Sequence, residues 1–133
     1  SIRRQRQMCI RDSPRTMNFI KKYNLKKKIN DNLTLTNPLS YLDFLWLEKN
    51  ASKNITDSGG VQKEAYMLGI PCITTRDETE WVETIENGWN VLAGTEKEKI
   101  LNCINLFNPK TKKKNIFGDG NSSKIICKII RNL

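Results

Sequence analysis

Residues 54–75, which read NITDSGGVQKEAYMLGIPCITT, decide the fold of this chain. The stretch predicts a short strand, a turn with two adjacent glycines, an amphipathic helix and a second strand. Gly59 and Gly60 leave the backbone open where side chains would block a ligand. The first N–H groups of the helix have no partner within it, and the helix dipole adds positive potential there. Together with Ser58, this turn is predicted to bind a phosphate or diphosphate.

Glu64 adds a second feature to the same helix. It lies four positions after Gly60, on the same face and about 6 Å further along the axis. A carboxylate there can accept hydrogen bonds from both hydroxyls of a ribose joined to the diphosphate, which favours a nucleoside diphosphate as ligand. A plainer interpretation also fits the residues, because a Ser-Gly-Gly turn before a helix is common and Glu64 can be a solvated helix residue.

Strand and helix patterns alternate from residue 33 onward, which favours an α/β fold with a Rossmann-like parallel sheet and helices on both faces. The predicted strands are residues 33–36, 54–56, 72–75 and 90–93, and the predicted helices are residues 41–49, 60–68, 80–86, 95–107 and 122–131. Ser40 with Asp43, and Thr95 with Glu98, have the spacing of capping boxes. The isoleucines of the last helix form one apolar stripe, which predicts a face docked on the domain core.

The length of 133 residues and the 38% of hydrophobic residues fit one domain with one core. Residues 1–13, SIRRQRQMCIRDS, match no element pattern and resemble the translation of a sequencing adapter. We therefore predict that residues 1–13 are a non-native tail and that residues 14–133 form the domain. The tail holds four arginines and one aspartate, so the formal charge of +9 (23 − 14) becomes +6 (19 − 13) without it.

The remaining positive charge lies mainly in two groups of lysines, around residues 21–28 and 112–114. A surface that binds single-stranded nucleic acid interleaves aromatic residues with basic ones, and only Tyr23 lies near the first group. We therefore expect solvated lysines and no nucleic-acid partner.

Four cysteines, Cys9, Cys72, Cys103 and Cys127, form no Cys-x-x-Cys pair, and the chain has no histidine. The sequence therefore predicts neither a metal site nor a redox motif, and we expect no cofactor. No apolar run reaches the length of a membrane span and no signal peptide is recognisable, which together predict a cytoplasmic protein.

Five longer motifs carry a family resemblance: PRT at residues 14–16, NPLSYLDFLWL at 37–47, TDSGGVQKEAYMLGIPCITTRDETEWVET at 56–84, NVLAGT at 90–95 and FGDGNSS at 117–123. In these motifs the chain resembles the C-terminal half of the non-hydrolysing UDP-N-acetylglucosamine 2-epimerases. The resemblance implies a GT-B fold, in which two Rossmann-like halves hold the nucleotide sugar between them. This chain would be the second half.

The same resemblance implies an isomerase that, as an intact protein, interconverts UDP-GlcNAc and UDP-ManNAc. It places the acid and base carboxylates in the N-terminal half, so that this chain holds no catalytic residue and is inactive alone. The intact enzyme is expected to be a homodimer. Within this chain, the resemblance assigns Ser58, Gly59 and Gly60 to the diphosphate of UDP, Glu64 to the ribose hydroxyls and Phe44 to a position beside the uracil.

One position departs from the family pattern. Many members carry an arginine after the pair that corresponds to Thr79 and Glu80, and that arginine meets the phosphates, but here Trp81 takes its place. Tryptophan has neither the charge nor the fork of donors of an arginine. Arg76 is the nearest replacement for the UDP contact, although it also fits an ordinary surface arginine at a strand end.

Two other classes of function remain compatible with these motifs. The C-terminal nucleotide-sugar-binding half of a GT-B glycosyltransferase would share the UDP site and transfer the sugar to an acceptor. A stand-alone binding or regulatory module derived from such a half would bind a nucleotide without catalysis.

Overall fold

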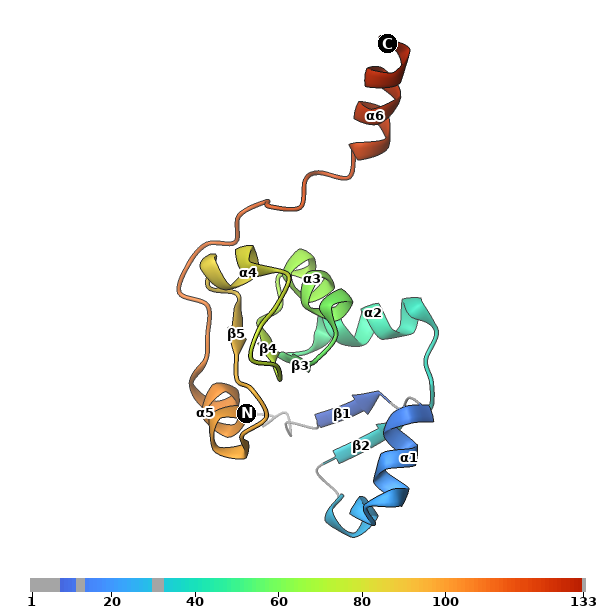
Figure 1. Cartoon of the computed structure of the whole chain (residues 1–133), viewed down its shortest axis with the longest axis vertical. Helices are drawn as coiled ribbons and strands as arrows, with labels where there is room; N and C mark the ends of the chain where they lie inside the picture. The colour runs from blue at the N-terminus through green and yellow to red at the C-terminus, as the bar shows by residue number, and fades with distance from the viewer. Residues whose placement is uncertain (1–7, 12–13, 30–32, 133) are drawn as a thin grey trace, which may run out of the picture. The chain divides into compact units, whose positions relative to one another are not determined.

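A parallel pair of strands organises the first of two units in the chain. The computed structural model describes residues 8–11, 14–29 and 33–132, and it divides the chain into residues 1–44 and residues 45–133 (Figure 1). In the first unit, β1 (Met8–Arg11) pairs with β2 (Leu33–Thr36). The connection contains α1 (Pro14–Lys22) and the 3-10 helix η1 (Leu25–Lys28). Parallel strands need a crossover of this kind, because a tight hairpin joins only antiparallel strands.

β1 lies within residues 1–13, for which the sequence predicted no element. That prediction is wrong for residues 8–11, which pair with β2 along their whole length. The reason is that strand formation depends strongly on an available partner edge, which a local pattern does not reveal. The non-native origin suggested for residues 1–13 is a separate question and stays a prediction.

The second unit is built on a three-stranded parallel sheet in the order β3-β4-β5 (Figure 1). Its strands are β3 (Asn54–Thr56), β4 (Cys72–Thr74) and β5 (Asn90–Leu92). The helices are the end of α2 (Tyr41–Asn50), which begins in the first unit, then α3 (Gly59–Leu68), α4 (Val82–Glu86), α5 (Lys97–Leu106) and α6 (Ser122–Arg131). The predicted α/β class with a parallel sheet is therefore confirmed.

The core of the second unit lies where α3 packs on β3 and β4. Ile73 and Ala65 are fully buried there, and Cys72 and Tyr66 are nearly so. Because all three strands run in the same direction, the loops that follow β3 and β4 leave the sheet at the same edge. That edge carries residues 57–58 and residues 75–81.

Most predicted element boundaries agree with the structure to within one or two residues. At the end of α3, Gly69 has a φ of 74°, as expected of a glycine that stops a helix. The Ser40–Asp43 capping box is confirmed: Ser40 Oγ donates to Asp43 Oδ2 over 2.6 Å, and the Asp43 N–H donates back to Ser40 Oγ over 3.2 Å.

The second predicted capping box is wrong. The helix α5 begins at Lys97, its cap residue is Glu96, and no side chain caps it. Glu96 pairs with the Lys99 ammonium over 3.1 Å.

The last helix also corrects an expectation. Its amphipathic stripe is present, but the four isoleucines at positions 125, 126, 129 and 130 are 54–63% exposed. The prediction that this face docks on the domain core is therefore wrong for the described residues. A helical period shows that a face is apolar, and it does not identify what the face meets.

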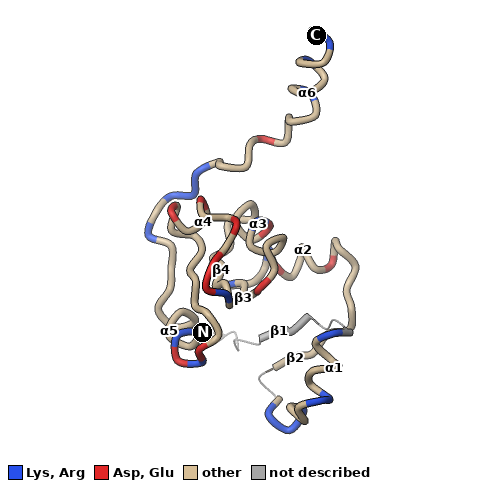
Figure 2. The backbone as a smooth tube through the Cα atoms, in the orientation of Figure 1, with Lys and Arg blue, Asp and Glu red and all other residues tan. Residues whose placement is uncertain are grey.

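Lysines and arginines gather in two stretches of the chain. Figure 2 shows them along α1 and η1 and along the segment between α5 and α6. Three cysteines with described side chains, Cys72, Cys103 and Cys127, are free. Within residues 8–11, 14–29 and 33–132, no helix is long and apolar enough to cross a membrane, and no group of acidic or thiol side chains could hold a metal ion.

Candidate functional site

The N-terminal end of α3, formed by Ser58, Gly59 and Gly60 and here called the α3 mouth, is the centre of the candidate site. Ser58 is the cap residue, with extended backbone angles, and its N–H donates to Thr56 Oγ1 over 3.0 Å. The first intrahelical donor near this end is the Gln62 N–H, which bonds to the Ser58 carbonyl over 3.1 Å. The N–H groups of residues 59–61 precede it, and the Ser58 side chain caps none of them.

Neither the backbone conformation nor the space around Gly60 requires a glycine at this position. Its φ is not positive, and a Cβ added to it would meet only Ser58 Oγ, at an ordinary contact distance of 3.7 Å. Glycine also costs stability in a helix, by roughly 0.5–1 kcal/mol relative to alanine. A ligand that approaches the backbone at this point would account for the missing side chain.

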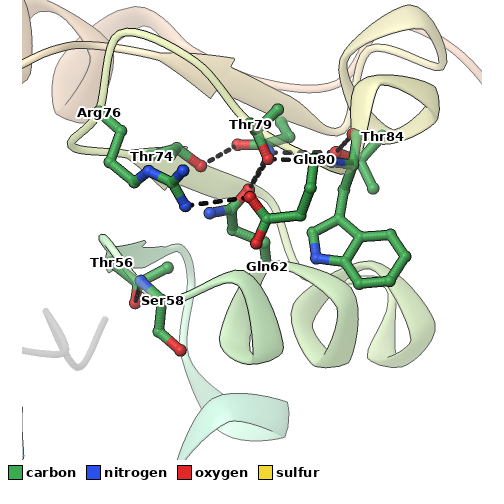
Figure 3. Close-up of polar contacts among 10 residues, drawn as sticks. Thr56, Ser58, Gln62, Thr74, Arg76, Thr79, Glu80 and Thr84 are labelled. Atoms are coloured by element: carbon green, nitrogen blue, oxygen red, sulfur yellow. Dashed lines mark hydrogen bonds and ion pairs between the residues drawn. The ribbon is translucent and has the colours of Figure 1, made fainter.

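Gly59 has a different environment, because the carboxylate of Glu80 lies against it. A Cβ on Gly59 would collide with Glu80 Oε1. Glu80 belongs to the loop after β4, and its Oε2 accepts a hydrogen bond from Arg76 Nη1 over 3.0 Å (Figure 3). The hydrogen bond from its own backbone N–H, followed by the charge of Arg76, lowers the pKa of Glu80, so the carboxylate is ionised at neutral pH. A protein anion therefore occupies the space in front of the first helix turn.

A buried polar network fixes the loop that carries Arg76 and Glu80. Gln62, which is fully buried on α3, accepts from Thr79 Oγ1 over 2.5 Å and from Asn90 Nδ2 over 3.3 Å. Thr79 Oγ1 in turn accepts from the Trp81 N–H over 3.1 Å. Figure 3 shows Gln62, Thr79 and Glu80 gathered over the start of α3.

Asn90 joins this network to the sheet. Its Oδ1 accepts from Thr74 Oγ1 over 2.8 Å and its Nδ2 donates to Thr84 Oγ1 over 3.1 Å. Thr84 Oγ1 donates to the Trp81 carbonyl over 2.7 Å. Strand β4, strand β5 and the loop are thus held in one hydrogen-bonded cluster, which keeps the loop in place beside the α3 mouth.

Two buried donors near the α3 mouth, Gln62 Nε2 and Trp81 Nε1, have no hydrogen-bond partner among the residues that the structure describes. A Cβ on Gly59 would lie 3.2 Å from Trp81 Nε1, so the indole N–H borders the same space as the Glu80 carboxylate. The indole ring also contacts Phe117, in a T-shaped arrangement with the ring centroids 5.5 Å apart, and Lys63, whose Nζ lies 4.8 Å from the ring centroid. Buried donors left unpaired cost about 1–3 kcal/mol each, so an acceptor bound at the α3 mouth would stabilise both groups.

The predicted site residues fall into two groups in the structure. Ser58, Gly59 and Gly60 form the α3 mouth, and Arg76 reaches it through Glu80. Glu64 is half-buried one turn further along α3, and its contact with a ribose stays a prediction. Phe44 belongs to the first unit, on α2, so its place beside a uracil also stays a prediction.

Sequence reasoning missed the roles of Gln62, Thr79, Glu80 and Trp81 around the α3 mouth. One signal was present, because Gln62 stands on the buried stripe of α3 together with Ala65 and Tyr66. A glutamine at a core position of a helix needs buried partners. The Glu80 contact had no comparable signal, since it depends on the path of a loop.

Comparison with known proteins identifies the family. The family described as UDP-N-acetylglucosamine 2-epimerase matches residues 5–131. A UDP-N-acetylglucosamine 2-epimerase homolog of Methanococcus maripaludis is 54% identical over 90% of this chain and 34% of its own length. The UDP-2,3-diacetamido-2,3-dideoxy-D-glucuronate 2-epimerase of Pseudomonas aeruginosa is 37% identical over 90% of this chain and 33% of its own length.

Solved structures agree with the sequence matches. The crystal structure of Methanocaldococcus jannaschii UDP-GlcNAc 2-epimerase in complex with UDP-GlcNAc and UDP superposes with a TM-score of 0.85 at 43% identity, over 96% of this chain and 36% of that chain. The chain spans about a third of the length of the curated relatives it matches. Its α/β architecture is of the GT-B type found in these neighbours. The chain therefore belongs to the UDP-N-acetylglucosamine 2-epimerase family.

Proposed function

We propose that this chain is the C-terminal, UDP-binding half of a non-hydrolysing UDP-N-acetylglucosamine 2-epimerase. The observation that carries the proposal is the α3 mouth itself. Its helix N–H groups precede the first intrahelical bond, and a close ligand would account for the missing side chain at Gly60. An anion is the natural ligand of such a helix end. The family description names a UDP-sugar, which supports UDP as the nucleotide that binds here.

In the proposed complex the diphosphate of UDP lies at the α3 mouth, where Ser58, Gly59 and Gly60 donate to it. Arg76 adds a positive charge from the loop after β4. The ribose then extends along α3, where Glu64 accepts from its hydroxyls. Phe44 belongs to the first unit, and its contact with the uracil is proposed from the family resemblance alone.

The names of two relatives support the proposal that this domain binds the nucleotide part of the substrate rather than the sugar part. The M. maripaludis and P. aeruginosa proteins share a UDP group and a 2-epimerase reaction in their names, and they differ in the sugar. Because this domain resembles both proteins, we assign it the binding of UDP, the substrate group that both names contain. We take UDP-GlcNAc and UDP-ManNAc as the substrates of the intact protein because N-acetylglucosamine is the sugar that the family description names.

The reaction of the intact protein would proceed by elimination of UDP across C1 and C2, protonation of the resulting glycal on the opposite face, and return of UDP to C1. Acid and base carboxylates must flank C2 for this path. We place them outside the 133 residues, which accordingly bind UDP without epimerising a substrate. The intact enzyme is proposed to be a homodimer of the cytoplasm.

The test is an assay of the intact protein with UDP-GlcNAc in heavy water, followed by proton NMR. Epimerisation predicts UDP-ManNAc that carries deuterium at C2, because the new proton comes from solvent. Release of free N-acetylmannosamine would instead identify a hydrolysing enzyme. Transfer of the sugar to an added acceptor without exchange at C2 would identify a GT-B glycosyltransferase and overturn the proposal.

A further inference from the structure

The α3 mouth already holds an anion that belongs to the protein. The Glu80 carboxylate lies against Gly59, at the end of the helix where a phosphate is proposed to bind. An ion pair with Arg76 and a hydrogen bond from its own backbone N–H hold it there, and the side chains of Arg76 and Glu80 are 36% and 50% exposed. An exposed carboxylate with one charged partner can leave this position without opening the core.

The space that Glu80 occupies is lined by donors that it does not use. Within the described part of the chain, Gln62 Nε2 and Trp81 Nε1 have no hydrogen-bond partner. Figure 3 shows the Gln62 amide nitrogen pointing to the side of the mouth where Arg76 lies. The N–H groups of residues 59–61 face the same end of the helix. These donors suit an anion with more acceptor oxygens than one carboxylate offers.

On the basis of the nucleotide site proposed above, we propose that Glu80 sets the affinity of the α3 mouth by occupying the phosphate position until a nucleoside diphosphate displaces it. Arg76 then exchanges the Glu80 carboxylate for a phosphate oxygen. The exchange involves no covalent step. It leaves the Trp81 indole N–H facing the ligand, at the position where many family members carry an arginine.

The direction of the effect follows from charge. A carboxylate and a diphosphate repel each other and cannot share the space over Gly59, so binding must break the Arg76–Glu80 ion pair. A diphosphate carries more charge and more acceptor oxygens, and its hydrogen bonds to helix N–H groups and to the guanidinium are charge-assisted. The diphosphate therefore displaces Glu80. Its binding affinity is lower than it would be without Glu80, because the Arg76–Glu80 ion pair is broken on binding.

The experiment measures the dissociation constants of UDP and of inorganic pyrophosphate for this 133-residue chain and its variants, from amide chemical shifts. Glu80→Gln removes the competing charge and keeps the size of the side chain. It should tighten both ligands about two- to fivefold, the range that corresponds to the loss of an exposed ion pair. Glu83→Gln is the matched control, because Glu83 is an exposed carboxylate on α4, and it should leave both constants unchanged.

A double-mutant cycle tests the exchange of partners by Arg76. Arg76→Gln should weaken UDP more in the Glu80→Gln background than in the wild-type chain. In the wild-type chain the new bond to phosphate replaces an existing bond to Glu80, whereas in the Glu80→Gln variant it is a net gain. Amide spectra without ligand confirm that each variant is folded.

The outcomes separate this inference from the proposed function. Tighter binding of UDP and pyrophosphate by Glu80→Gln alone supports the inference. Unchanged or weaker binding by Glu80→Gln, with the wild-type chain still binding UDP, overturns the inference and leaves the nucleotide site standing. If neither the wild-type chain nor Glu80→Gln binds UDP or pyrophosphate, the nucleotide site fails and this inference fails with it.

Discussion

At the scale of single residues, a substitution of Gly60 is expected to affect UDP binding without lowering the stability of the fold. Gly60→Ala should keep or slightly raise stability, because the added methyl meets nothing closer than 3.7 Å and alanine is favoured in a helix by roughly 0.5–1 kcal/mol. The same methyl should weaken UDP binding at least tenfold by keeping phosphate from the backbone. Urea unfolding and a UDP titration of the same variant measure the two effects. A variant that binds UDP normally would show that no ligand requires a glycine at position 60.

Glu64 allows a test of the nucleoside part of the site. Glu64→Gln keeps the shape of the side chain and weakens its acceptor strength toward the ribose hydroxyls. UDP affinity should fall by about 1–2 kcal/mol, which is roughly a 5- to 30-fold change in the dissociation constant. The control is 2′-deoxy-UDP, which lacks one of the two hydroxyls and should lose less in the variant than UDP does. Equal binding of UDP and 2′-deoxy-UDP by the wild-type chain would show that Glu64 does not bind the ribose.

Among the secondary-structure elements, the buried network between β4, β5 and α3 carries a measurable share of the stability. Asn90 is 3% exposed and makes three hydrogen bonds to Gln62, Thr74 and Thr84. Asn90→Ala removes these three buried hydrogen bonds, while Gln62 keeps its bond from Thr79 and Thr84 keeps its bond to the Trp81 carbonyl. The variant should lower the free energy of unfolding by roughly 2–3 kcal/mol. The matched control is Asn102→Ala on α5, where the asparagine is exposed and no loss is expected. The measurement is urea unfolding of both variants. An Asn90→Ala variant as stable as Asn102→Ala would show that the network does not contribute to the stability.

The central strand β4 can be probed through its cysteine. Burial raises the pKa of the Cys72 thiol from 9.0 to about 12, so the thiol stays neutral and protected at pH 8, whereas Cys127 is exposed. Iodoacetamide should therefore label Cys127 quickly and Cys72 only after unfolding. The sign for stability follows, because a raised pKa favours the folded state below pH 9 and this contribution disappears as the pH rises toward 12. Mass spectrometry of labelled peptides is the measurement, and fast labelling of Cys72 in the native chain would contradict the core described for β4.

The elements show what a sequence can reveal and what it cannot. The strands and helices of the second unit were predictable because hydrophobic period and punctuating residues such as Gly69 act locally. The Ser40–Asp43 cap was predictable for the same reason. β1 and the exposed face of α6 were not, because strand pairing and the covering of a helix face depend on partners distant in the sequence.

In the candidate site, too, the local features could be predicted from the sequence, and the features that depend on distant segments could not. The α3 mouth could be located from the spacing of Ser58, Gly59 and Gly60, since a glycine turn and a helix end are local features. The Glu80 carboxylate over Gly59 could not, because it depends on how the loop after β4 returns to α3. The indole N–H of Trp81 was discounted as a replacement for arginine, and only the structure shows that it borders the same space.

For the whole molecule, binding and turnover are expected to be separable. The chain covers about a third of its curated relatives, and we expect it to bind UDP and to leave UDP-GlcNAc unchanged. Incubation with UDP-GlcNAc and proton NMR of the sugar checks the second statement, with the intact protein as the positive control. Formation of UDP-ManNAc by the 133 residues alone would show that the acid and base lie within this chain.

The most direct test of the central claim is a titration of the 15N-labelled chain with UDP, followed through its amide signals. We predict saturable shifts that are largest for residues 58–64. The shifts of residues 58–60 should persist when pyrophosphate replaces UDP, and in Gly60→Ala the shifts should need about tenfold more UDP or higher to saturate. Signals of residues 58–64 that stay unmoved at high UDP concentration would contradict the claim that the α3 mouth binds the diphosphate.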